Sequence, residues 1–273
     1  LVNSLAHRTT WLRSDFISPL INLSGTISTA IGEVPFNSNE EYLTWYASAT
    51  ASEEAFNALC PMTLNFDPFV APIAIGGEDY VVTSITNMVF TNDNVISVRF
   101  REGSQITNIE STAFYASHSL VEIVNESSIS FNVGDYGTDI RFNPILEIVT
   151  DKANSKLVTI NGNIYKDYNG NRYFIKNIDH STKIEIDSSA TQIYQYALDS
   201  RSDITSVTIP EDITVIGERA FNDTLSLTEI NFNATNVSNL QENNNVFYHA
   251  GQNSPGITVN IGANVTKIPA YIF

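Results

Sequence analysis

An internal repeat in residues 82–273 constrains the fold more than any other feature of the sequence. Six segments share a frame that opens on a small or β-branched apolar residue, has Ile or Leu at the fourth position and closes on Ala-Phe or a near equivalent. They span 82–90, 106–114, 190–198, 213–221, 237–247 and 265–273, and the fifth has two extra residues. Steps of 23 to 26 residues between most of these copies are typical of coils stacked in a solenoid.

A short strand of the form hydrophobic-x-hydrophobic lies between these segments. It occurs at Val98–Phe100, Ile184–Ile186, Val207–Ile209, Ile230–Phe232 and Val259–Ile261. Strand side chains alternate between faces, so the two apolar residues point inward and the middle one outward. A single copy cannot bury its apolar face, whereas stacked copies pair in parallel and form one continuous core. In the Ala-Phe segment, the small residue permits close approach and the ring fills the opposite side of the coil.

The segment Ile204–Phe221 closely resembles the consensus of the BspA-like leucine-rich repeat family. The resemblance extends over residues 82–124 and 181–273. It implies a mainly β fold of the α/β leucine-rich-repeat class, a curved solenoid with a parallel sheet. Leu198 in place of Phe, and Val246 and Ile272 in place of Ala, make the repeat less regular.

Residues 125–180 interrupt the repeat, and 163–175 within them predict a β-hairpin. Asn169-Gly170 is the preferred type I′ turn and is flanked by β-forming residues. Family members carry comparable hairpins, so the resemblance implies an insertion in the solenoid and not a further domain. A calcium loop at 167–171 is disfavoured because the spacing and the terminal Glu are absent.

Residues 1–81 lack the repeat and predict a helical and irregular region for attachment and capping. Helix starts at 38–41 and 52–54 lead into apolar residues, and the second helix stops before Pro61. Such a region would cover the open strand edge of the first coil. We therefore divide the chain into 1–81 and a solenoid of 82–273.

The first thirteen residues resemble a short motif found near the N-terminal regions of bacteriophage tail-fibre proteins. The motif reads Asn-x-Leu-Ala-x-Arg-Thr-x-aromatic-Leu-Lys/Arg and matches Asn3–Arg13. The alternative is an ordinary amphipathic helix with Leu1, Leu5 and Leu12 facing inward. The chain begins with Leu and ends within a repeat, so we expect it to be cut from a longer polypeptide.

Composition excludes several classes of function. A net charge of −16 without a basic cluster disfavours nucleic acid. Cys60 is the single cysteine, which excludes an internal disulfide or a cysteine-based zinc site and favours a small buried side chain. No apolar run approaches the ~18 residues of a membrane span, so we expect no membrane insertion.

The sequence contains no recognisable catalytic constellation. Nucleophile-elbow, zinc-protease, phosphate-loop and dinucleotide motifs are missing. His7, His118, His180 and His249 are scattered, and turn or packing roles are expected for His118 and His249, which fall near the Ala-Phe segments. Acidic pairs such as Glu40-Glu41 are typical of solvated helix starts. The two acids of a glycosidase come together only in the folded protein, so the sequence by itself does not exclude such a pair. We predict no enzyme, no cofactor and no metal.

The candidate binding site is the outward face of the parallel sheet. The central strand residues on this face are Arg99, Glu185, Thr208, Asn231 and Asn260. Two positions earlier stand Ser97, Lys183, Ser206, Glu229 and Thr258, which are also expected to point outward. Repeat proteins present extended surfaces in this way. The alternative is a merely solvated strand face.

The sequence leaves three hypotheses about function. The preferred hypothesis is a fibre or appendage component of a phage virion, trimeric through residues 1–60 and in contact with other virion proteins, that recognises a host. The alternative is a bacterial cell-surface or secreted adhesin that binds proteins or glycans on another cell, the role that the repeat family more usually implies. A glycan-degrading enzyme with the repeats as an accessory module is the third.

Overall fold

In the computed structural model, residues 95–273 are described apart from 105, 107, 116, 131, 133 and 135–142, together with the backbone of six short strands before residue 95. The chain divides into two compact units, residues 1–155 and 156–273, which are described separately. The fibre-like motif, the two expected helices and Cys60 lie outside the described residues. The predicted boundary at 81/82 stays a prediction.

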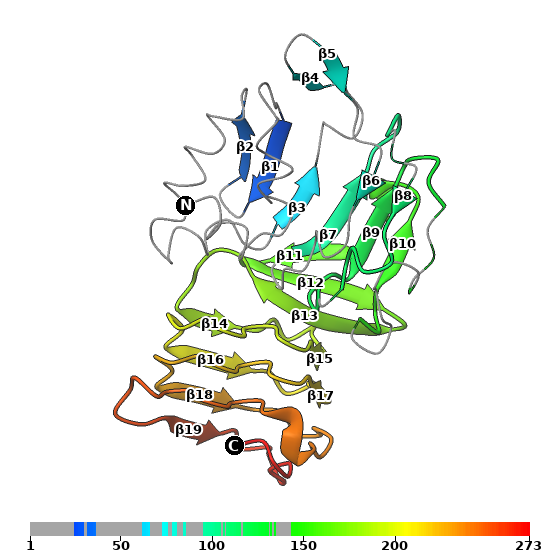
Figure 1. Cartoon of the computed structure of the whole chain (residues 1–273). Coiled ribbons are helices and arrows are strands. Elements are labelled where there is room, and N and C mark those ends of the chain that lie inside the picture. The colour runs from blue at the N-terminus through cyan, green and yellow to red at the C-terminus, as the bar shows by residue number, and fades with distance from the viewer. Residues whose placement is uncertain are drawn as a thin grey trace. The chain divides into compact units, whose positions relative to one another are not determined.

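Unit 2 contains the most regular coils. Four parallel strands form one sheet in the order β14-β16-β18-β19, with bounds Lys183–Glu185, Ser206–Ile209, Glu229–Phe232 and Thr258–Ile261. Figure 1 shows them stacked one above the next. The register advances by 23 residues from β14 to β16 and again from β16 to β18, so that Ile184, Val207 and Ile230 are paired in turn. The predicted parallel sheet is confirmed.

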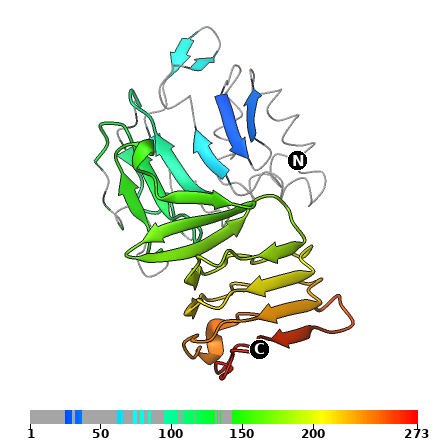
Figure 2. The same cartoon turned by 180° about the vertical axis from the view of Figure 1, so that it is seen from behind.

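A second sheet of unit 2 joins the predicted hairpin to the repeats. Its order is β11-β12-β13-β15-β17, with bounds Leu157–Ile160, Asn163–Tyr168, Asn171–Asn177, Gln192–Ile193 and Val215–Ile216. Figure 2 shows this arrangement from behind. Asn169 and Gly170 both have positive φ, as a type I′ turn requires. Because β13 pairs in parallel with β15, the hairpin is built into the stack of coils.

The core of unit 2 follows the predicted alternation. Val207, Ile209 and Phe232 are fully buried, and so is Ala220 of the Ala-Phe segment. Phe rings of successive coils stack: the centroids of Phe221 and Phe247 are 4.7 Å apart, and those of Phe247 and Phe273 are 5.6 Å apart. Stacked aromatic pairs add to the free energy gained by burial alone. The Ala-Phe segment thus fills one side of the coils, as predicted.

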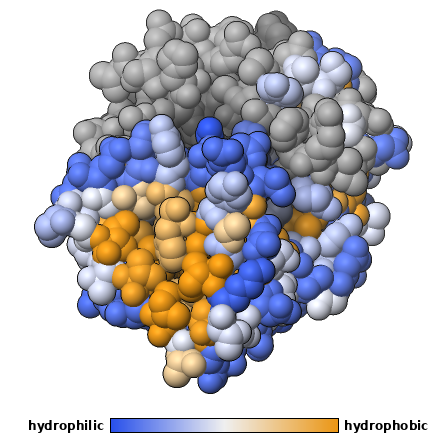
Figure 3. All heavy atoms as spheres, turned by 90° about the horizontal axis from the view of Figure 1, so that it is seen from below, coloured by the Kyte–Doolittle hydropathy of each residue, from blue (hydrophilic) through white to orange (hydrophobic). Residues whose placement is uncertain are grey.

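The last coil leaves apolar side chains exposed at its outer face. Ile261, Ile268 and Phe273 are 42–60% exposed, and Figure 3 shows a hydrophobic cluster at this end of unit 2.

Unit 1 also contains parallel strands of the repeat. β7 (Val95–Phe100), β9 (Glu122–Asn125) and β10 (Glu147–Val149) pair in register at steps of 25 residues. Strands β9 and β10 are absent from the predicted set, and β10 extends the repeat into the range expected to interrupt it. The interruption is therefore shorter than predicted.

The region before the repeats is described only as strands. β3 (Met62–Asn65) pairs in parallel with β7. On its other side β3 pairs antiparallel with β1 (Gly25–Thr29), and β1 pairs antiparallel with β2 (Gly32–Phe36). Further short strands are β4 (Ile73–Ile75), β5 (Glu78–Tyr80), β6 (Ser84–Ile85) and β8 (Asn108–Ile109). Strand β3 thus covers the edge of β7, where the sequence predicted a helical or irregular region. Lys152–Asn154 and Glu242–Asn244 are two 3-10 turns among the described residues. No helix in the described part is long and apolar enough to cross a membrane.

Gly217 marks a place where two coils approach closely. A Cβ built there would lie 2.4 Å from the backbone nitrogen of Gln195 in the preceding coil. We expect Gly217→Ala to lower the free energy of unfolding by about 2 kcal/mol, because backbone atoms must move to admit the methyl group. Urea denaturation measures this. Glu218→Ala, which changes the exposed neighbouring side chain, is the matched control and should stay within about 0.5 kcal/mol of the original chain.

Arg99 and Glu126 join neighbouring coils of unit 1. Arg99 Nε and Nη2 donate to the Glu126 carboxylate at 2.9 and 2.8 Å, and this bond chiefly holds the pKa of Glu126 below its ordinary value. A lowered folded-state pKa stabilises the fold above the unfolded-state value and ceases to do so as pH falls through the folded-state value.

We therefore expect Glu126→Gln to lower the free energy of unfolding by about 1 kcal/mol near neutral pH. This difference should shrink as the pH falls through the lowered folded-state pKa of Glu126, where the original carboxyl becomes protonated. Urea denaturation at neutral pH and at an acid pH below that pKa tests it, with Glu102→Gln as the exposed control. A difference independent of pH would contradict the role given to the charge.

Candidate functional site

Four of the predicted binding residues form one row across the sheet of unit 2. The strand register pairs Glu185 with Thr208, Thr208 with Asn231, and Asn231 with Asn260. Neighbouring strands are about 4.8 Å apart, so the row repeats at that spacing. Glu185 and Asn260 are exposed, and Thr208 and Asn231 are partly exposed. We call these four residues the polar row.

Hydrogen bonds between side chains order the polar row. Asn260 Nδ2 donates to Asn231 Oδ1 at 2.9 Å and to Glu229 Oε1 at 2.9 Å. Asn231 Nδ2 is 3.4 Å from Thr208 Oγ1. Side chains held by their neighbours lose less conformational entropy when a partner binds. The row therefore presents amide, hydroxyl and carboxylate groups in a fixed order.

Arg99 is not a member of this row. It lies on β7 of unit 1, and its register partner on β9 is Val124, which is buried. Its guanidinium is paired with Glu126. The structure therefore brings together four of the five predicted residues and leaves Arg99 in a separate ion pair.

The flanking positions are exposed only in part. Lys183, Glu229 and Thr258 follow the expectation, whereas Ser97 and Ser206 are buried, at 2% and 7% exposure. Ser206 stands in register between Lys183 and Glu229. Long side chains on both sides cover a short one, which accounts for its burial. Ser97 and Ser206 are therefore not available as exposed parts of the binding face.

A second polar cluster, absent from the predicted site, follows the Ala-Phe segments. Asn222 donates to Asp199 at 2.6 Å and to Asp223 at 2.8 Å, and Asp223 lies 2.8 Å from His249 Nδ1. Asp223 and His249 have positive φ. The recurrence of polar residues one or two places after Leu198, Phe221 and Phe247 was the available signal. The cluster joins the turns of successive coils, which agrees with the turn role expected for His249.

The groups described here can bind but are not arranged to hold a metal. In the described residues, no group of three or more His, Cys, Asp or Glu side chains has a geometry that could coordinate an ion. The polar row offers hydrogen-bond donors, acceptors and one terminal carboxylate. Such a surface is suited to holding another molecule.

Comparison with solved structures finds leucine-rich repeat proteins. A leucine-rich repeat protein from Eubacterium ventriosum is 20% identical with a TM-score of 0.35, and the match covers 73% of this chain and 44% of that one. The pneumococcal vaccine antigen PcpA is 14% identical with a TM-score of 0.39, covering 74% and 73%. A leucine rich cell surface protein from Faecalibacterium prausnitzii is 14% identical with a TM-score of 0.25, covering 68% and 58%.

Sequence comparison identifies the repeats directly. No curated protein matches the chain. The model of the BspA type leucine rich repeat region matches six copies, over residues 79–137 and 138–254. These ranges make up more than half of the residues, and they contain most of the repeat segments found in the sequence. The chain belongs to the BspA type leucine-rich repeat family.

Proposed function

We propose that this chain is part of a bacterial cell-surface protein that adheres to a protein or glycan on another cell through the outer face of its parallel sheet. The observation that carries the proposal is the polar row, in which four side chains from successive coils share one face. Membership of the BspA type family supports it, because adhesion is the role that this resemblance implies.

The charge of the chain limits the chemical classes of partner that the surface favours. Acidic residues outnumber basic ones by 30 to 14, and the row itself contains Glu185, while Glu229 stands at a flanking position on another strand. A surface of this kind repels phosphate backbones and favours partners with hydroxyl, amide or basic groups. The proposed activity is binding without catalysis.

The phage-fibre hypothesis has weaker support. It depends on the motif at 3–13, which lies outside the described residues and outside the ranges matched by the family model. Trimerisation through residues 1–60 depends on the same segment. The adhesin, which was the alternative, is therefore the function that we prefer.

Immunogold electron microscopy tests the location. Antibodies raised against this chain should label the envelope of intact bacterial cells, with pre-immune serum as the control. Purified phage from the same culture should remain unlabelled. Label on phage appendages would overturn the cell-surface assignment and restore the fibre hypothesis.

Substitution within the polar row tests the binding face. Thr208→Arg places a long charged side chain at the centre of the row, where it would obstruct a partner. We expect retention of the purified chain on fixed epithelial cells to fall about tenfold, as for a central interface residue. Thr266→Arg makes the same change at an exposed position outside the row. Equal retention of both variants would remove the polar row from the binding surface.

A further inference from the structure

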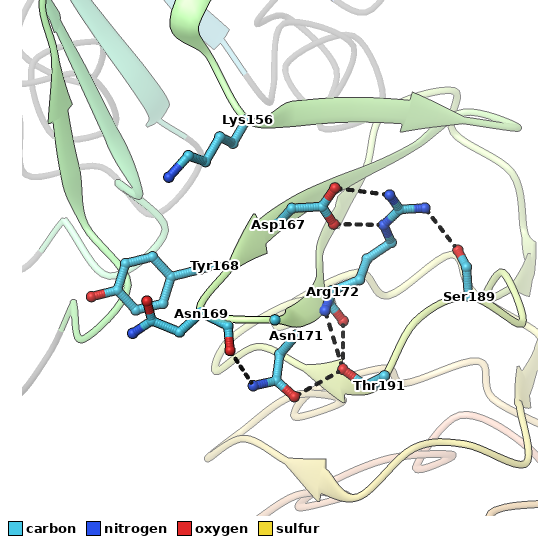
Figure 4. A pocket seen from close by; sticks show the side chains of 9 residues that line it. Lys156, Asp167, Tyr168, Asn169, Asn171, Arg172, Ser189 and Thr191 are labelled. Carbon is cyan, nitrogen blue, oxygen red and sulfur yellow. Dashed lines mark hydrogen bonds and ion pairs between the residues drawn. The ribbon is translucent and has the colours of Figure 1, made fainter.

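Side-chain hydrogen bonds attach the β12–β13 hairpin to the following coil at two places. At the tip of the hairpin, Arg172 donates to Asp167 at 2.7 and 2.8 Å and to Ser189 Oγ at 3.0 Å (Figure 4). Thr191 Oγ1 accepts from the backbone nitrogen of Arg172 at 3.1 Å. The bond from Arg172 chiefly holds the pKa of Asp167 below its ordinary value of 3.8, so the tip attachment keeps its ion pair in mild acid.

The second attachment lies at the other end of β13, where the chain leaves the hairpin. Arg201, between β15 and β16, donates from Nη1 to Asn177 Oδ1 at 3.1 Å and from Nη2 to the backbone oxygen of Ser181 at 3.2 Å. The same guanidinium donates to both carboxylate oxygens of Asp203 at 2.8 and 2.9 Å. Arg201 therefore fastens residues 177–181 to the following coil.

His180 lies within this fastened segment, directly before the carbonyl group of Ser181 that Arg201 binds. Its backbone is left-handed, with a φ of 58°, and its ring nitrogen Nε2 is buried without a hydrogen-bond partner. A neutral imidazole is compatible with this burial, because its one proton can reside on Nδ1. Both nitrogens of a protonated ring are donors, so the buried Nε2–H would have no acceptor.

The charges around His180 add to this cost of protonation. Arg201 and Asp203 act on it from the following coil, and Asp179 acts on it from its own segment. Both carboxylates are already engaged, because Asp203 accepts from Arg201 and Asp179 accepts two hydrogen bonds within its own segment. Burial of the ring and the charge of Arg201 outweigh the carboxylates and hold the pKa of His180 below its ordinary value of 6.5.

The lowered pKa of His180 fixes the direction of the pH effect. The unfolded or opened segment binds the proton more readily than the closed one does. The closed arrangement is therefore fully stable above pH 6.5 and loses stability as the pH falls from there towards the folded-state pKa of His180.

Two buried asparagines connect this attachment to the first strand of the polar row. Asn177, which accepts from Arg201, donates to Asn163 Oδ1 at 2.9 Å. Asn163 in turn donates to the backbone oxygen of Glu185 at 2.9 Å, and Glu185 is the member of the polar row on β14. The two asparagines are 4% and 2% exposed. A displacement of the segment that Arg201 holds therefore reaches β14 through direct contacts.

We propose that residues 177–182 form an acid-sensitive latch, in which protonation of His180 turns its ring out to solvent, weakens the hold of Arg201 and loosens β14. The tip attachment, formed by Asp167, Arg172, Ser189 and Thr191, contains no histidine and remains closed (Figure 4). The change is a local opening at one end of the hairpin and not an unfolding of the coils. The latch is a property of the fold and does not depend on what the polar row binds.

Hydrogen–deuterium exchange of the 273-residue chain at about pH 7.5 and about pH 5 tests the latch. Each exchange rate is divided by the intrinsic rate of an unstructured peptide at the same pH. We expect the protection of amides in residues 177–185 to be about tenfold lower at the acid pH, as one unsatisfied buried donor would cause. The protection of β16 and β18 should stay unchanged.

Two histidine variants assign the effect to one ring. His180→Asn removes the titrating group, and asparagine tolerates left-handed backbone, so protection of 177–185 should become equal at both pH values. His249→Asn is the matched control, because His249 also has a φ of 58° but is partly exposed, with Nδ1 2.8 Å from Asp223. This variant should retain the loosening in acid. In the original chain, the midpoint of the loosening should coincide with the titration of the His180 ring measured by NMR.

Any of three results would overturn the latch. The first is equal protection of 177–185 at both pH values in the original chain. The second is a loss of protection in acid that the His180→Asn variant preserves. The third is an equal loss across β16 and β18, which would indicate general unfolding in acid. Failure of the proposed adhesion would change none of these measurements.

Discussion

No coil of this protein can bury its own apolar face, and the rest of the structure depends on that constraint. Val207 is fully buried because Ile184 and Ile230 lie on the strands at either side. Burial of such a side chain contributes roughly 1.5–3 kcal/mol, but only while both neighbouring coils are in place. The same stacking aligns the strands and superimposes the Phe rings. Stability is therefore shared between coils and belongs to no single one.

Stacking explains which parts of the fold were predictable. Inward residues recur at each step, so the parallel strands of unit 2 and the Ala-Phe segments could be found from spacing, and the hairpin from Asn169-Gly170. The left-handed backbone of Tyr196, Arg219 and Tyr271 could not. These residue types give no sign of positive φ, and it is the tight bend of each coil that imposes it.

The strands of unit 1 show a second limit. β9 and β10 lack the alternating burial of the predicted strands, because Glu122–Val124 are all buried and Glu147–Val149 are all partly exposed, and the recognisable Ala-Phe segment is missing between them. Their assignment needs the register with β7, which only the fold supplies. Strand β3 likewise pairs with the distant strands β1 and β7, and such pairing leaves little local trace in the sequence.

The candidate site was predictable to the extent that it follows from register. Once Ile184, Val207 and Ile230 face inward, the residue after each must face outward, so Glu185, Thr208 and Asn231 fall in one row. Register does not reveal which side chains of neighbouring coils contact these positions. It could not foresee that Arg99 is paired with Glu126, 27 residues away, or that two long side chains cover Ser206.

The positions that stacking leaves unconstrained are the ones available for function. Inward positions are restricted to apolar residues of suitable size, whereas the outward positions and the hairpin tip bear no part of the core. The hairpin is accommodated because β13 continues the parallel pairing into β15, so its tip can vary without disturbing the coils. Asp167, Arg172 and Ser189 meet at that tip through contacts between the hairpin and the following coil. A repeat fold that needs only its inner face for stability can therefore vary the outer face of its sheet and its inserted hairpin without loss of the core.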